Sequence, residues 1–374
     1  MPLTRRQLLL ATGATAAMPR VAIARPGYPS ERIAPMLMVG FDGAGSHDAG
    51  ARTMAGHITA GRVGGICFIA KNAVTRKGVE SLTGLFHLAA ERRWPLLMAI
   101  DQEGGNVQRL SSHLGYGFEP SPARVADTWD TNRARRIYAA MAAAMRDTGF
   151  NLNLAPVVDL GFEPRNVLIT QKGRTFGTDA AAVVRYSRAF VEGHRNEGVL
   201  TALKHFPGHG SALGDSHEGT VDVTATWRES ELTPYVCLAA EGMADMVMTG
   251  HVSHQMLTDG LPASLSAAAI GGLLRTRVGY GGVVITDDLD MKAVSKRFTR
   301  EESVIRAVEA GNDILLATND DSDPDLPLHM ILAVQKGIRD GRLSTDRIEA
   351  SVRRIAALKA TLAGRGRARL AGRE

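Results

Sequence analysis

Ionisable side chains that could do chemistry gather in a few short stretches of the sequence. Asp287 follows the apolar run at residues 283–285, and a carboxylate at the tip of a buried strand can act as a nucleophile or a base. His217 stands two residues after Asp215, a spacing at which the carboxylate can reach one ring nitrogen and fix the tautomer. His217 is therefore a candidate general acid, and a purely structural Asp–His hydrogen bond is the alternative.

Directional hydrogen-bonding groups accompany these three residues. They suit the binding of hydroxyl groups on a ligand, and they are Asp101, Arg109, Arg174, Lys204 and His205. The Gly104-Gly105 pair and the turn at residues 206–208 would allow backbone to approach a ligand closely, although the same glycines also suit simple turns.

A metal site is the competing interpretation of the histidines. The residues that could form a zinc hydrolase set are His205, His209, His217, His251 and Asp287. Barrel metal hydrolases usually place an H-x-H pair after the first strand, where this sequence has only His47. Lys204 also puts a cation where the metal would sit. We therefore expect no metal and no cofactor.

Short apolar runs must position these residues. The runs resemble buried parallel strands, and they occupy residues 35–40, 65–70, 95–100, 152–158, 200–203, 246–249, 282–286 and 313–318. Stretches of helical period separate them, at residues 79–92, 131–148, 180–197, 229–241, 266–278 and 301–310. This alternation predicts one (β/α)₈ TIM barrel, a fold in which the chemistry collects at the carboxyl ends of the strands. The candidate residues follow five consecutive predicted strands, the third to the seventh, as such a barrel requires.

A doubly wound open sheet is the alternative fold. Such sheets usually carry a glycine-rich dinucleotide turn after the first strand, and residues 40–45 (GFDGAG) lack the G-x-G-x-x-G spacing. We therefore predict a single catalytic barrel domain over residues 25–363. Closing helices at residues 326–338 and 345–363 complete it, and a basic flexible tail follows at residues 364–374.

Charge and cysteine content argue against other classes of protein. The net charge is +5, but residues 1–24 and residues 361–374 each carry +3, which leaves the body near −1. Without a basic patch in the body, we expect no nucleic-acid partner. Two cysteines rule out a disulfide framework.

The first 24 residues predict an export signal. They hold the Arg5-Arg6 pair, a weakly apolar stretch and an A-x-A site at residues 22–24. The stretch is far shorter than the ~20 residues that span a bilayer. The arginine pair favours the twin-arginine route, with a disordered leader as the alternative. We expect a periplasmic or extracellular protein with no integral membrane segment after signal removal.

Four motifs, taken in their order along the chain, identify a family. They are Asp101-Gln-Glu-Gly-Gly-Asn-Val-Gln-Arg109, Leu154-Ala-Pro-Val-Val-Asp159, Lys204-His-Phe-Pro-Gly-His-Gly210 followed by Asp215-Ser-His217, and Thr286-Asp-Asp-Leu289. This order resembles the β-N-acetylglucosaminidase (NagZ-type) branch of glycoside hydrolase family 3. The similarity extends over nearly all of the sequence that follows the export signal.

The resemblance implies a barrel without cofactor or metal that hydrolyses terminal β-linked N-acetylglucosamine, above all in peptidoglycan muropeptides. It implies that Asp287 is the nucleophile of a covalent glycosyl-enzyme, that His217 is the acid/base and that Asp215 is its dyad partner. Retention of the anomeric configuration follows from two displacements. The positions that match sugar-holding residues are Asp101, Arg109, Arg174, Lys204 and His205. We expect a monomer.

Two alternatives to this activity stay open. One is another family 3 activity, either a β-glucosidase or a phosphorylase. The β-glucosidases commonly carry a second α/β domain and lack the Asp-Ser-His loop, which this sequence has at residues 215–217. The other is a catalytically silent cell-wall-binding barrel, which would lack the nucleophile or the acid/base.

Overall fold

The computed structural model describes residues 27–91 and 95–371, and the predicted export signal lies outside these residues. Eight parallel strands form one sheet in the order β11-β9-β7-β6-β3-β2-β1-β12. Their bounds are β1 (Leu37–Val39), β2 (Gly65–Phe68), β3 (Leu97–Ile100), β6 (Leu152–Asn153), β7 (Leu200–Phe206), β9 (Met246–Thr249), β11 (Val283–Thr286) and β12 (Leu315–Ala317). Every one overlaps a predicted apolar run, since a strand buried on both faces is apolar throughout.

The sheet closes on itself between β11 and β12. A parallel bridge joins Ile285 to Ile314, and the Ile314 N–H donates to the Val284 carbonyl at 3.0 Å. On its other side β12 pairs in parallel with β1, with Leu37 opposite Leu315. The predicted (β/α)₈ barrel is therefore confirmed, and the open doubly wound sheet is wrong.

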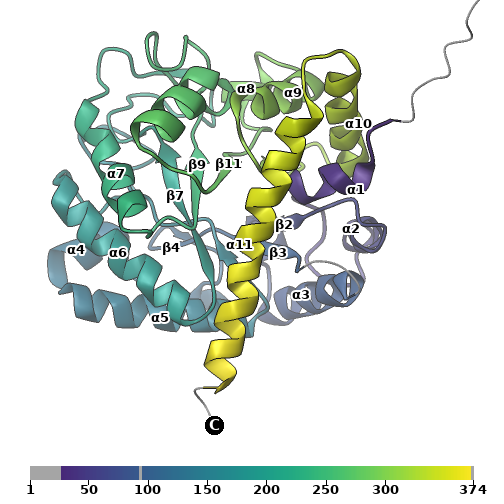
Figure 1. The fold of residues 1–374 in the computed structure, drawn as a ribbon. Helices are drawn as coiled ribbons and strands as arrows, with labels where there is room; N and C mark the ends of the chain where they lie inside the picture. Colours follow the sequence, from purple (N-terminus) through teal and green to yellow (C-terminus); the bar gives the residue numbers. More distant parts are fainter. Residues whose placement is uncertain (1–26, 92–94, 372–374) are drawn as a thin grey trace, which may run out of the picture.

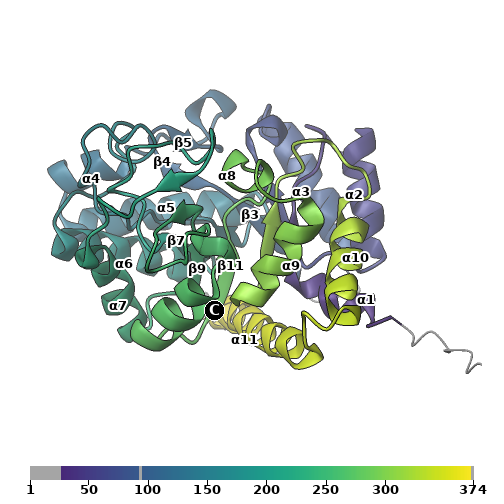
Figure 2. The same ribbon diagram turned by 90° about the horizontal axis from the view of Figure 1, so that it is seen from above.

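Helices surround the strands on the outside of the barrel (Figures 1 and 2). The longer ones are α2 (Ala49–Thr59), α3 (Arg76–Ala90), α5 (Thr131–Asp147), α6 (Ala180–Asn196), α7 (Thr233–Ala240), α9 (Arg300–Ala310), α10 (Leu326–Arg339) and α11 (Thr345–Ala371). The short ones are α1 (Ser30–Ile33), α4 (Pro122–Thr128) and α8 (Lys292–Ser295). No helix in the described part of the chain combines the length and the apolar character that a membrane crossing needs.

Two predicted helices differ in detail. The segment predicted at residues 266–278 is a π-helix over Ala268–Arg277, and it contains the Gly271-Gly272 pair. Helix α11 continues to Ala371, past residue 364, where the sequence predicted the start of a flexible tail. Arginine, alanine and leucine are good helix formers, and they outweigh the two glycines at 364 and 366.

The buried carboxylate of Asp313 stabilises the place where β11 and β12 meet and close the barrel, which we call the seam. Asp313 Oδ2 accepts the Val284 N–H at 3.0 Å and Arg275 Nη2 at 2.8 Å. Its Oδ1 accepts Ser351 Oγ at 2.6 Å and Arg354 Nη1 at 3.0 Å. Because Ser351 and Arg354 belong to α11, Asp313 ties that helix to the seam.

Two small sheets extend the loops at the carboxyl ends of the barrel strands. One is the antiparallel pair β4 (Gln102–Gly104) and β5 (Val107–Gln108), directly after β3. The other pairs β8 (Val221–Asp222) with β10 (Val252–Ser253) in parallel. They give regular backbone structure to the loops that carry the candidate residues.

Candidate active site

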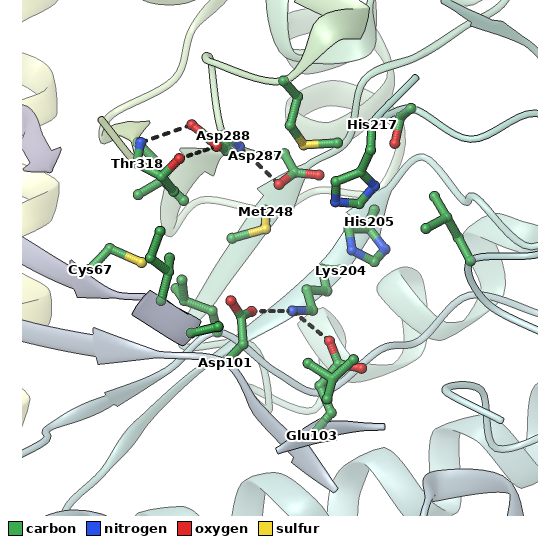
Figure 3. A pocket seen from close by; sticks show the side chains of 18 of the residues that line it. Cys67, Asp101, Glu103, Lys204, His205, His217, Met248, Asp287, Asp288 and Thr318 are labelled. Carbon is green, nitrogen blue, oxygen red and sulfur yellow. Dashed lines mark hydrogen bonds and ion pairs between the residues drawn. The ribbon is translucent and has the colours of Figure 1, made fainter. Parts of the chain in front are cut away.

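A cavity of about 840 Å³ lies at the carboxyl ends of the barrel strands. Figure 3 shows its labelled side chains converging from several strand ends. The predicted site residues that line it are Asp101, Arg109, Arg174, Lys204, His205, His217 and Asp287. Asp215 is not in the lining, and it contacts the cavity through His217.

Four charged side chains form an inner ion-pair cluster, made of Asp101, Glu103, Arg174 and Lys204 (Figure 3 labels three of them). Lys204 Nζ lies 2.7 Å from Asp101 Oδ1 and 2.8 Å from Glu103 Oε1. Arg174 donates to both oxygens of Glu103, each at 2.8 Å, and its third nitrogen donates to the Leu168 carbonyl at 3.3 Å. Burial favours the neutral acid, but the charges of Arg174 and Lys204 outweigh it and hold the pKa of Glu103 well below its usual range.

Lys204 and His205 lie within β7, whereas the predicted strand ended at residue 203. The backbone pairing continues because the Lys204 N–H donates to the Pro156 carbonyl at 3.1 Å and its own carbonyl accepts the Val158 N–H at 2.8 Å. The strand can bury these polar side chains since each has a charged partner.

That partner for His205 is Asp159. His205 Nδ1 lies 2.7 Å from Asp159 Oδ2, and Asp159 Oδ1 accepts the backbone N–H groups of His205 and His209 at 3.1 and 2.8 Å. Burial raises the pKa of Asp159, but the charges of His205 and His209 and their hydrogen bonds to this carboxylate lower it by more. With Nδ1 engaged, Nε2 is the His205 nitrogen left for a ligand.

Asp287 and Asp288 are neighbours just after β11 (Figure 3). Their surroundings shift the pKa values of the two carboxyl groups in opposite directions. Asp287 Oδ1 accepts the Asp288 N–H at 2.8 Å. Burial raises the pKa of Asp287, but the charges of His251 and His205 help to bring it below its usual value. Asp288 instead accepts the N–H and hydroxyl of Thr318 at 3.0 and 2.5 Å, and burial raises its pKa to about 7. Both residues line the cavity, and Asp287 is the one of the two whose environment favours the ionised form.

The His217–Asp215 dyad has the contact that its spacing predicts. His217 Nδ1 lies 2.9 Å from Asp215 Oδ1, and the same oxygen accepts the His217 N–H at 2.8 Å. The side chain of His217 is 59% exposed and that of Asp215 is 27% exposed. Figure 3 shows the His217 ring on the same side of the cavity as the Asp287 carboxylate.

The remaining histidines of the zinc alternative have other partners. His251 is buried, with Nδ1 2.7 Å from Ser264 Oγ and Nε2 2.7 Å from the Asp288 carbonyl. His209 Nε2 lies 3.3 Å from Ser216 Oγ. Within residues 27–91 and 95–371, no group of three or more His, Cys, Asp or Glu side chains has an arrangement that could hold a metal.

The glycines near the site pack against protein. At Gly104 (φ +97°) a Cβ would lie 2.5 Å from the Pro120 carbonyl oxygen, and at Gly208 (φ +125°) it would lie 2.4 Å from Glu231 Oε2. Both positive φ values favour glycine. Turn geometry is therefore sufficient to explain glycine at both positions.

Sequence reasoning missed three residues that organise the site. Glu103, Asp159 and Asp288 stand inside the motifs quoted above, but their roles depend on partners at least 30 residues away in the sequence. Their shared signal is a carboxylate just after an apolar run, which Asp159 and Asp288 show plainly. Arg109 is a predicted site residue, and its Nε is buried with no hydrogen-bond partner among the residues that the structure describes.

The fold and the cavity together define a barrel hydrolase. An ionised carboxylate at a strand tip and an imidazole–carboxylate dyad share one cavity, and such groups can supply a nucleophile and an acid/base for hydrolysis. The model of the glycosyl hydrolase family 3 N terminal domain matches residues 30–358. The chain therefore belongs to glycoside hydrolase family 3, which confirms the predicted family.

Similar proteins indicate which group of family 3 enzymes this chain resembles. Beta-hexosaminidase LpqI of Mycobacterium tuberculosis is 38% identical over 281 residues, which cover 73% of this chain and 70% of the relative. The beta-hexosaminidase of Alkalilimnicola ehrlichii is 36% identical over 292 residues, which cover 76% of this chain and 80% of the relative. This enzyme is a glycoside hydrolase of the β-N-acetylhexosaminidase group.

A solved structure agrees with that grouping. The family 3 β-N-acetylglucosaminidase from Paenibacillus sp. str. FPU-7 superposes with a TM-score of 0.82 at 34% identity. The match covers 90% of this chain and 63% of that one, so this chain spans less than two thirds of the Paenibacillus protein.

Proposed function

We propose that the chain is a retaining exo-β-N-acetylglucosaminidase that removes terminal β-linked N-acetylglucosamine from peptidoglycan fragments. The observation that carries the proposal is the shared cavity, in which Asp287 is held ionised while His217 keeps one ring nitrogen free of Asp215. The sugar is suggested by relatives named beta-hexosaminidase and by a neighbour described as a β-N-acetylglucosaminidase.

The proposed reaction has two displacements. Asp287 attacks the anomeric carbon while His217 gives its proton to the glycosidic oxygen, so that the aglycone leaves as an alcohol and a glycosyl ester forms on Asp287. A water molecule then attacks the same carbon and loses its proton to His217, which frees Asp287. Two inversions at one carbon give net retention.

The inner ion-pair cluster holds the sugar in this proposal. Lys204 Nζ donates to Asp101 Oδ1, which leaves Asp101 Oδ2 to accept a hydrogen bond from a sugar hydroxyl. Arg174 has all three nitrogens engaged by Glu103 and Leu168, so it acts by positioning Glu103 and, through it, Lys204. His205 offers Nε2, and Arg109 brings its guanidinium group to the same cavity.

Phosphorolysis and glucoside hydrolysis are the activities to separate from this one. A neutral imidazole repels phosphate less than a carboxylate would, so His217 is compatible with a phosphorylase. The test is an assay on an aryl β-N-acetylglucosaminide and an aryl β-glucoside, each with and without phosphate. We expect the enzyme to hydrolyse only the aryl β-N-acetylglucosaminide and to need no phosphate for it. NMR should show that the first product is the β-anomer. No turnover of the N-acetylglucosaminide would overturn the proposal.

We also propose export by the twin-arginine route and action as a monomer. The paired Arg5-Arg6, which lie outside the described residues, support the route. Replacing both arginines by lysine should leave the full-length precursor inside the cell, as fractionation would reveal. Export of the variant at the normal rate would contradict the route.

A further inference from the structure

The cations that line the cavity differ in whether they have an acidic partner. Lys71 pairs with Asp42 at 2.7 Å and Lys292 with Glu218 at 3.1 Å, while Arg174 and Lys204 belong to the inner ion-pair cluster and Arg109 is assigned to the terminal sugar in the proposed function. Lys172 also lines the cavity, is exposed, and has no ion pair among the residues that the structure describes. Its ammonium group is therefore available to an acidic ligand.

The backbone around Lys172 is held from two sides. Asn106 Nδ2, beside the β4–β5 turn, donates to the Lys172 carbonyl at 3.1 Å. The next residue, Gly173, donates its N–H to the Thr170 carbonyl at 3.0 Å and accepts the Ala123 N–H at 3.1 Å. Hydrogen bonds therefore hold the backbone of Lys172 in place, while its long side chain can adapt its position at the wall of the cavity.

Lys172 and His217 of the dyad line the same cavity. Burial raises the pKa of Asp215, but the hydrogen bonds and charge of His217 and, less strongly, the charge of Lys172 lower it by more. The acid/base must reach the glycosidic oxygen, so the leaving sugar lies on the dyad's side of the cavity. A cation near the dyad therefore faces the leaving sugar.

We propose that Lys172 binds a carboxylate on the leaving sugar and makes the enzyme selective for acidic aglycones. This inference rests on the proposed function. A lysine is a point charge on a flexible stem, so it suits a carboxylate whose position varies. An exposed pair of this kind contributes little and is weakened by salt, which makes the expected preference a few-fold.

The experiment compares substrates that differ in one charge. They are the disaccharide of N-acetylglucosamine β-1,4-linked to N-acetylmuramic acid, with a free 3-O-lactyl carboxylate, and its methyl ester. N,N′-diacetylchitobiose serves as the reference without the lactyl group. For the full chain at low salt we expect kcat/KM to be about three- to fivefold higher for the acid than for the ester, as an exposed ion pair allows.

Substitutions then locate the preference. Lys172→Met should bring the acid-to-ester ratio close to one, and Lys172→Arg should keep it. Lys77→Met removes an exposed lysine from α3, outside the cavity lining, and should leave the ratio unchanged. Raising the salt concentration should lower the ratio in the parent enzyme but not in Lys172→Met.

Separate outcomes would overturn the two proposals. Failure of the parent enzyme on chitobiose and on both lactyl disaccharides would overturn the proposed function. Turnover with an acid-to-ester ratio near one, or with a ratio that survives in Lys172→Met, would overturn only the role of Lys172. Loss of a phosphate-dependent reaction in Lys172→Met, with its ratio kept, would place phosphate at this lysine and also overturn the inference.

Discussion

The inner ion-pair cluster and the His217–Asp215 dyad face one cavity but are built differently. In the cluster, the side chains of Glu103, Lys204 and Arg174 are 1%, 3% and 9% exposed, and their partners come from three separate loops or strands. In the dyad, the side chain of His217 is 59% exposed and its hydrogen bonds to Asp215 close within three residues of chain.

This contrast matches the work of each part. A group that recognises one sugar in every step benefits from being held rigidly and away from water, because a preorganised site needs no rearrangement when the ligand arrives. A proton donor must serve a departing alcohol in one step and an incoming water in the next. Local hydrogen bonds orient such a group without sealing it off from solvent.

The largest effect on activity is expected at Asp287. In the proposed reaction the inner ion-pair cluster holds the sugar that Asp287 attacks, and the His217–Asp215 dyad protonates the leaving group. Asp287→Ala removes the nucleophile, so kcat should fall by more than about 10⁴-fold on any N-acetylglucosaminide. Steady-state assays with a circular dichroism spectrum would measure activity and fold together. Asp340→Ala, an exposed carboxylate paired with Lys336 on the surface, is the matched control and should keep full activity. Appreciable turnover by Asp287→Ala would remove this residue from the reaction.

The exposed dyad is tested through the leaving group. His217→Ala should slow hydrolysis of chitobiose by ~10²–10⁴-fold, the usual contribution of general acid catalysis. Dinitrophenyl N-acetylglucosaminide needs little protonation of its leaving group, so its glycosylation step should be much less affected. Pre-steady-state kinetics on both substrates would separate the steps. An equal loss of the glycosylation rate on both would argue against His217 as the acid.

The buried cluster is tested through stability. Glu103→Gln leaves Arg174 and Lys204 as buried cations with fewer partners, and such a loss costs about 3 kcal/mol in free energy of unfolding. Asp215→Asn in the dyad should cost less than about 1 kcal/mol, as exposed pairs do. Urea denaturation of both variants measures the two values. Similar values would remove the energetic difference between the regions.

The smallest effect sharpens the same comparison through pH. The folded-state pKa of Glu103 lies below its ordinary value of 4.5, so its ionisation stabilises the fold above that pH, and this stability is lost as the pH falls below it. The difference in unfolding free energy between the parent enzyme and Glu103→Gln should therefore shrink on acidification from pH 7 toward 3. A difference that stays constant over this range would contradict the charge interaction as its source.

The barrel could be predicted from sequence because its strands are apolar throughout and its helices are periodic. The ends of elements were harder to predict. Lys204 looked like the first residue of a loop, since a charged side chain rarely extends a buried strand. Its two carboxylate partners, Asp101 and Glu103, stand about a hundred residues earlier.

The residues that line the site could be predicted from their places after the strands, but the contacts between them could be predicted only where they are local in sequence. Asp215 and His217 are two residues apart, so their contact followed from spacing. The Glu103–Arg174 pair spans 71 residues, and nothing in a single sequence couples two such positions. Both Asp287 and Asp288 are buried, and their pKa values move in opposite directions because His251 and His205 lie near Asp287 whereas the carboxylate of Asp290 lies near Asp288, which adjacent identical residues do not reveal.

The pairing of β1 with β12 has a consequence for biosynthesis. Leu37 lies opposite Leu315, so the ring of strands stays open until the ribosome has made residue 315 and the chain beyond it has emerged. Until then the nascent protein exposes two unpaired strand edges, which are sites of aggregation. Asp313 adds a further wait, because its partners Ser351 and Arg354 are translated later still. Closure of the cavity is thus among the last events in the making of the enzyme.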